Sequence, residues 1–287
     1  MRANATVQAR KDTTYGRFYE IDGRSYPSVT NILNIIGKPA LINWAAKVER
    51  EMVIKVSSEL YQDMPFSERR MSPEAWIVTL NNRLGKEKAM AKELAKAGEI
   101  GTQVHDLIEW TLKGELCYEV GPSPRITDKA QWAFMAWEDW RRSVKLKPFY
   151  VEQVVYSQNY GYAGTLDLLC EINLSELISY YIKKKQEVPD QLTGLSKRQV
   201  SALTVCDWKT GRAIYPEAYL QNAAYRQAWR EMGQGSPELG LIVRLPKVET
   251  DPEFEVQVAP MESYSFEKFR AAYSLWTWQQ QYEKGKP

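Results

Sequence analysis

A short apolar run that ends in charged residues constrains this chain more strongly than any other feature. Residues 202–206 read A-L-T-V-C, a run typical of a buried β-strand, and Asp207, Trp208 and Lys209 follow it directly. Side chains two residues apart in a strand point to the same face, so Lys209 lies beside Asp207 while Trp208 points the other way. The sequence therefore predicts an acid and a lysine side by side at one strand end, with Trp208 in the core.

A second isolated acid interrupts an earlier apolar segment. Asp167 lies between apolar residues in 163–172, which we expect to be a strand. An unpaired charge inside such a strand is costly, so Asp167 needs a ligand or a salt-bridge partner. Glu152 lies in the strand expected at 149–157, which should pair with the Asp167 strand. From the residues alone, Glu152 is either a third acid at the same site or an exposed strand residue.

Carboxylates and a lysine at one sheet edge are the groups that a metal-dependent phosphodiester-cleaving site requires. A hard cation binds oxygen ligands, neutralises the phosphoryl group and lowers the pKa of the attacking water. Asp167 and Asp207 would supply those oxygens, and the ammonium of Lys209 would orient the water and balance developing charge. An acid and a lysine at a strand end are more often simply solvated, so this interpretation depends on the neighbouring motifs.

Short motifs follow one another along the chain: G-x-x-x-H at 101–105, G-x-x-D at 164–167, D-x-K-T-G at 207–211 and Q-x-x-x-Y at 221–225. In this order they resemble the RecB-like exonuclease branch of the PD-(D/E)xK nuclease superfamily. Residues 26–30, Y-P-S-V-T, are also similar to RecB-like nucleases of tailed phages and to mitochondrial genome maintenance exonucleases.

The resemblance implies a fold and a metal site. The fold would be α/β with the αβββαβ core of this superfamily, a mixed central sheet flanked by helices. Asp167, Asp207 and Lys209 would be catalytic, and His105, Asp167 and Asp207 would bind the metal, with Glu152 as an additional candidate acid. His105 is the only histidine of the chain. It would bind through a neutral imidazole nitrogen, and the alternative is a histidine hydrogen-bonded within the core.

The resemblance also implies a substrate and partners. Thr210, Gln221 and Tyr225 would line the path of the DNA, although a Gln and Tyr four residues apart can equally be an amphipathic helix boundary. We expect a Mg²⁺-dependent DNA nuclease, with Mn²⁺ as a substitute, that acts as an exonuclease on single strands or duplex ends. Recombination or replication proteins would be its partners. A structure-specific endonuclease and a nuclease-like DNA-binding module that does not cleave stay open as alternatives.

Composition sets wider bounds on the class of protein. The 287 residues are 44% hydrophobic with a mean hydropathy of −0.48, as in soluble globular proteins, and a net charge of +2 is too small to prove nucleic-acid binding. No apolar run suits a membrane span or a signal peptide, so we expect a cytoplasmic protein, in the host cytoplasm if a phage encodes it. Cys117, Cys170 and Cys206 are too few for the four-cysteine iron–sulfur cluster of some RecB-like nucleases, so we expect no such cluster.

The pattern of elements predicts an N-terminal extension at 1–85 and a nuclease core at 86–287. The extension would hold a hairpin around Asp22 and Gly23 and helices that include 40–57 and 74–84. In the core we expect helices at 86–114, 128–144, 216–232 and 264–283, and strands at 149–157, 163–172, 202–209, 239–245 and 253–259. An insertion at 173–201, partly helical, would separate the second and third of these strands.

Overall fold

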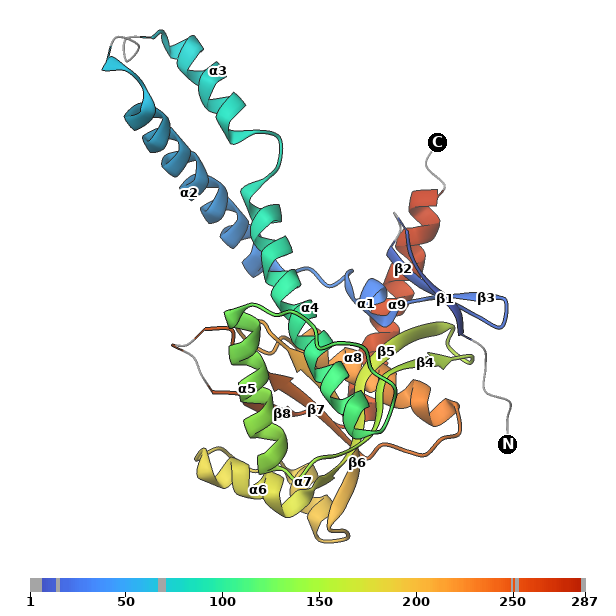
Figure 1. Cartoon of the computed structure of the whole chain (residues 1–287). Helices are drawn as coiled ribbons and strands as arrows, with labels where there is room; N and C mark the ends of the chain where they lie inside the picture. The colour runs from blue at the N-terminus through green and yellow to red at the C-terminus, as the bar shows by residue number, and fades with distance from the viewer. Residues whose placement is uncertain (1–6, 14–15, 67–70, 249, 251–252, 285–287) are drawn as a thin grey trace. The chain divides into compact units, whose positions relative to one another are not determined.

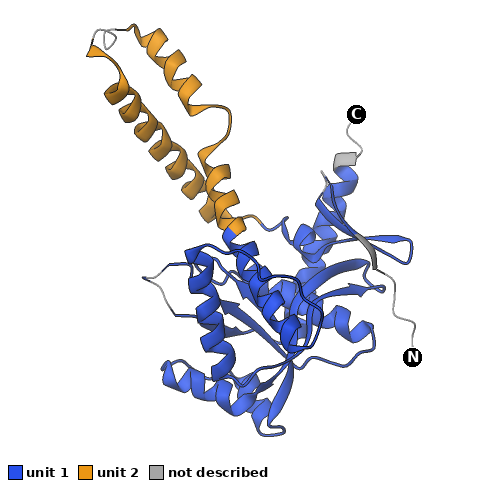
Figure 2. Cartoon of the chain, in the orientation of Figure 1, with its two compact units in different colours: residues 1–36, 100–287 blue, residues 37–99 orange. Residues whose placement is uncertain are grey.

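The computed structural model describes residues 7–13, 16–66, 71–248, 250 and 253–284 of the chain. Contacts divide the chain into two compact units: unit 1 comprises Met1–Ile36 and Ile100–Pro287, and unit 2 comprises Gly37–Glu99 (Figure 2). This division differs from the boundary expected after residue 85, because the segment before Gly37 packs on the central sheet of unit 1.

A five-stranded mixed sheet forms the centre of unit 1 (Figure 1). Its strands, in spatial order, are β4 (Lys147–Ser157), β5 (Tyr162–Asn173), β6 (Ser201–Lys209), β7 (Leu239–Arg244) and β8 (Glu255–Val258). All neighbours are antiparallel except β6 and β7, which are parallel and joined by a crossover through helix α8 (Pro216–Glu231). The expected α/β class, with a mixed sheet and flanking helices, is confirmed.

Helices cover both faces of this sheet. One core contains residues from α5 (Asp128–Ser143), from the part of α4 (Ala89–Glu115) that lies in unit 1, and from α6 (Leu174–Lys183) and α7 (Asp190–Ser196). Trp208 is buried there, with its ring edge-on to Trp137 and Trp140 at centroid distances of 6.2 and 5.2 Å. The prediction that Trp208 faces the core is therefore confirmed.

The second core lies on the opposite face of the sheet. It joins α8 to α9 (Glu262–Lys284) and to the short helix α1 (Val29–Leu33). Phe266 and Phe269 of α9 are buried in this core, and Tyr273 and Trp276 are packed against it. Helix α1 is a short helix that ends at Leu33.

A small N-terminal sheet contains β1 (Val7–Thr13), β2 (Gly16–Ile21) and β3 (Arg24–Pro27). The predicted hairpin between β2 and β3 is confirmed, and Asp22 and Gly23 both have the positive φ, 48° and 74°, that a tight hairpin turn needs. Strand β1 was not predicted, because its residues V-Q-A-R-K-D-T have no clear apolar alternation.

Unit 2 contains α2 (Pro39–Asp63), α3 (Pro73–Leu84) and the beginning of α4. Helix α2 continues six residues beyond the predicted end at 57, and Val56 is its buried residue. Helix α3 has no buried residue. In the described part of the chain, no helix is both long and apolar enough to cross a membrane.

Candidate metal centre

Two acids meet where the pairing of β5 with β6 ends. The last pair joins Leu168 to Cys206, so the same register places Asp167 opposite Asp207. The side chain of Asp167 replaces a ladder contact at this point, because its Oδ2 accepts a hydrogen bond from the backbone N–H of Trp208 at 2.8 Å. Both acids are buried. The two isolated acids of the sequence therefore lie at one level of the sheet.

Glu152 comes to the same level from the other side of Asp167. Its neighbours Val151 and Gln153 pair with Leu168 and Leu166, so the register places Glu152 opposite Asp167. Glu152 has a φ of 48° in the middle of β4, a left-handed conformation that L-residues rarely adopt in a strand. Such outliers cost roughly 1–3 kcal/mol and gather at functional sites.

His105 of α4 completes a group of candidate cation ligands. Its Nδ1 lies 3.8 Å from Oδ2 of Asp167 and 3.9 Å from Oε1 of Glu152. One ligand atom from each of these residues lies within 4.8 Å of the others. A set of two carboxylates and one imidazole suits a divalent cation. Glu152 therefore lies where a third acid of the site would lie, beside Asp167.

Asp207 faces Lys209 and Gln221 and is not a member of that group. Its Oδ1 accepts a hydrogen bond from Nε2 of Gln221 at 3.0 Å, and its Oδ2 lies 2.5 Å from Nζ of Lys209. Apart from this ion pair, Oδ2 has no hydrogen-bond partner among the described residues. Nζ of Lys209 also donates to Oε1 of Gln221 at 3.2 Å. Gln221 therefore fixes the acid and the lysine relative to one another.

Tyr225 supports this network from one turn along α8. The amide of Gln221 donates to the Tyr225 hydroxyl at 3.1 Å. Tyr225 is only 3% exposed, so its ring is a packing element of the site. The ring fits because residue 164 is glycine: a Cβ there would lie 2.5 Å from Cε1 of Tyr225. Reasoning from the sequence gave Gly164 no role, although its place in the G-x-x-D motif was the available signal.

A second glycine allows α4 to approach the end of β6. A Cβ at Gly101 would lie 3.0 Å from Oγ1 of Thr210, so a larger residue would crowd that hydroxyl. Gly101 precedes His105 by one helical turn and therefore lies on the same face of α4. The close approach that Gly101 permits brings His105 to the two acids.

Burial and mutual repulsion shift the pKa values of this cluster. Burial, together with the charge of Asp167, raises the pKa of Asp207 to about 6 against the opposing effect of Lys209. Burial also raises the pKa of Asp167. Desolvation disfavours the charged form of Lys209, but the two aspartates outweigh it and raise the pKa of that ammonium. The centre thus concentrates negative charge that one lysine does not fully offset.

The carboxylates around His105 favour its protonated form. Burial acts to lower its pKa, but the carboxylates of Asp167 and Glu152 outweigh burial and raise the pKa to about 9. The imidazolium therefore supplies part of the positive charge that the acids require. The sequence led us to expect a neutral imidazole, and His105 must lose this proton before its nitrogen can bind a cation.

The two cysteines in the central sheet are packing residues. Cys170 and Cys206 are buried in β5 and β6 with their Sγ atoms 3.5 Å apart and unbridged, whereas Cys117 is exposed.

Comparison with known proteins adds no relative: no family model matches the chain, and no curated protein matches it significantly.

Proposed function

We propose that this protein is a metal-dependent DNA nuclease with a PD-(D/E)xK core of the RecB-like type. It would act as an exonuclease on single strands or duplex ends in recombination, repair or replication. The observation that carries the proposal is the partly buried cluster at the β5–β6 level, in which Asp167, Glu152 and His105 face one another and Lys209 is held beside Asp207.

The residues of the cluster fit a divalent cation. Asp167, Glu152 and His105 offer a compact set of donor atoms. Among the described residues, the buried Oδ2 of Asp207 contacts only the ammonium of Lys209 as a polar partner. Mg²⁺ or Mn²⁺, when bound, supplies neutralisation of the phosphoryl charge and a lower pKa for the attacking water.

Lys209 would act on the substrate directly. Its ammonium stays protonated between Asp207 and Gln221, so it can orient a water molecule and balance negative charge on the phosphoryl group. Gln221 and Tyr225 would be positioning residues that act through this ammonium. Thr210 follows Lys209 at the strand end and would contact the DNA backbone. The products would carry a 5′-phosphate and a 3′-hydroxyl.

A divalent-metal titration with end-labelled linear single strands, duplexes and circular single strands tests the proposal. We expect cleavage of linear DNA that depends on Mg²⁺ or Mn²⁺, is abolished by EDTA and leaves circles intact. A Lys209→Ala variant, purified in the same way, controls for contaminating nucleases. Cleavage of the circle would point to a structure-specific endonuclease. DNA binding without cleavage in either metal would point to a non-cleaving module.

A further inference from the structure

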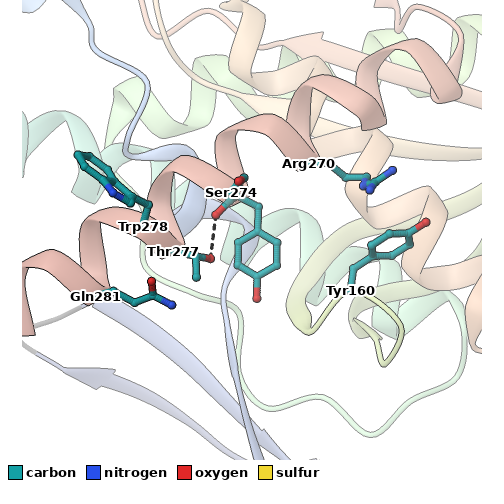
Figure 3. Close-up of a pocket in the computed structure, with 7 residues that line it drawn as sticks. Tyr160, Arg270, Ser274, Thr277, Trp278 and Gln281 are labelled. Carbon is teal, nitrogen blue, oxygen red and sulfur yellow. Dashed lines mark hydrogen bonds between the residues drawn. The ribbon is translucent and has the colours of Figure 1, made fainter.

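Two adjoining hollows lie between α9 and the turn that joins β4 to β5. The first has a volume of about 390 Å³ and is lined by residues that include Tyr160, Arg270, Trp278 and Gln281. The second, of about 350 Å³, shares Tyr160 and Arg270 with the first. Figure 3 shows Tyr160 and Arg270 together at one end of the first hollow and Trp278 and Gln281 toward the other. The hollows adjoin at Tyr160 and Arg270, and together they are called the α9 groove below.

The side chains of the α9 groove have the chemistry of a single-strand binding site. Trp278 is 63% exposed and Tyr160 is 36% exposed, so each has ring surface for an unpaired base besides its own contact, Trp278 with Tyr282 at 5.8 Å and Tyr160 with Phe266 at 5.0 Å. The guanidinium carbon of Arg270 lies 5.2 Å from the centre of the Tyr160 ring. The contact that the structure gives this guanidinium is with the Tyr160 ring, and Arg270 lines both hollows, where its charge can meet a phosphate.

The first hollow of the α9 groove suits a phosphate better than the second, because the nearby acids line the second. Glu262 and Glu267 line only the second hollow. Both oxygens of Glu262 accept hydrogen bonds from Arg230 at 2.7 Å, so that carboxylate is already neutralised. Glu267 lies 3.9 Å from Lys268 on the surface. A phosphate would therefore contact Arg270 from the Trp278 side.

The position of the groove suits a strand that also reaches the metal centre. Helix α9 packs beside α8, which supplies Gln221 to the centre, and the Tyr273 hydroxyl fixes α9 to the turn by donating to the carbonyl of Gly161 at 2.8 Å. Tyr162, which follows the turn directly, and Asp167 are five residue steps apart along β5, which is about 17 Å. A single strand several nucleotides long is needed to span that distance, within the roughly 4–16 nucleotides that single-strand grooves hold.

We infer that the α9 groove binds unpaired nucleotides of the substrate away from the cleaved bond, with bases on Trp278 and Tyr160 and a phosphate on Arg270. The inference rests on the proposed function and deepens it, because it names single-stranded nucleic acid as the substrate class that the site holds.

Fluorescence anisotropy of a labelled dT20 oligonucleotide in EDTA tests the groove without any cleavage. We expect Tyr160→Ala and Trp278→Ala each to weaken binding about tenfold, as loss of a stacking platform does. Arg270→Gln should reduce the slope of log affinity against log salt by about 0.7, the value for one phosphate contact on a single strand. Tyr264→Ala is the matched control, because Tyr264 is a 60% exposed aromatic residue of α9 that lines neither hollow. It should change affinity less than twofold.

Cleavage kinetics in Mg²⁺ then connect the groove to the centre. The groove variants should raise KM for dT20 with kcat unchanged, and should leave cleavage of a dT4 substrate as in the wild type. If all groove variants bind dT20 as tightly as Tyr264→Ala does, the inference is overturned, whether or not the wild type cleaves DNA. Loss of self-association in Trp278→Ala, with DNA affinity intact, would identify the groove as a protein interface and also overturn it. Absence of cleavage with the predicted binding losses would refute only the proposed nuclease activity.

Discussion

Two substitutions of Glu152 test whether the left-handed backbone beside Asp167 is a real cost to the fold. Glu152→Ala and Glu152→Gly both remove the carboxylate that lies near His105. The difference between their free energies of unfolding therefore measures the cost of the left-handed backbone at residue 152. Alanine in the left-handed region costs about 1–2 kcal/mol, which glycine avoids. In a regular strand, glycine is instead about 0.5–1 kcal/mol less stable than alanine. Subtracting the second quantity from the first leaves Glu152→Gly more stable than Glu152→Ala by about 0.75 kcal/mol at the midpoints of the two ranges.

The assay is urea unfolding in EDTA, followed by tryptophan fluorescence and by circular dichroism. Coincident transitions from the two probes and equal m values are required before the midpoints are compared. Both variants should lose Mg²⁺-dependent cleavage to the same extent, because neither retains the carboxylate. Glu152→Gln, which keeps the size of the side chain and the backbone cost, serves as a stability reference. A Glu152→Gly protein that is less stable than Glu152→Ala by 0.5 kcal/mol or more would refute the argument, since that is the order expected in an unstrained strand.

Further variants test the acids, the glycines and the cation. Asp207 has a folded-state pKa of about 6. This lies above its unfolded value, so its stabilising contribution is complete at low pH and is lost as the pH rises through 6. In the absence of metal, the stability of Asp207→Asn relative to the wild type should therefore increase as the pH rises from 4 to 7, by at most about 3 kcal/mol. Thermal melts across that pH range measure this difference. No gain would mean that Lys209 already offsets the buried charge. Gly164→Ala should cost about 1–3 kcal/mol and lower kcat, because its Cβ would displace the Tyr225 ring. Gly194→Ala is the control, because a Cβ at this position in α7 would meet no other atom within 4 Å. This substitution should be neutral or stabilising in the same urea assay. Calorimetric titration with Mg²⁺ should give tighter binding and smaller proton release as the pH rises from 6.5 toward 9, because His105, with a pKa of about 9, must lose its proton to become a ligand. The pH dependence should weaken in His105→Asn, and an unchanged dependence would remove His105 from the ligand set.

The sequence was sufficient for the residues that follow simple strand rules. The apolar run before Asp207 and the alternation through Lys209 predicted β6 and the burial of Trp208, and the apolar segment around Asp167 predicted β5. The left-handed backbone of Glu152 was beyond such reasoning, because such a residue within a strand breaks the alternation and glutamate does not signal that conformation.

Contacts distant in sequence were equally hard to predict. The place of Gly164 against Tyr225 depends on how α8 packs on β5 after a crossover, and a single glycine in a strand does not specify its neighbour. The division at Gly37 also depends on tertiary contacts, because β3 and α1 join unit 1 through β5 and not through any feature of their own composition.

Several unfavourable features of unit 1 coincide at one level of the sheet. Asp167 and Asp207 are buried with raised pKa values, and Glu152 adopts a left-handed backbone beside them. Each of these features costs free energy in the cation-free protein, and none improves the packing of the cores on either side. A divalent cation would reduce the repulsion among all three carboxylates at once, whereas the single proton on His105 offsets it only in part. We therefore expect Mg²⁺ to raise the stability of the wild type. Asp167→Asn and Glu152→Gln should each lose this Mg²⁺-dependent increase, and this result does not depend on any assay of cleavage.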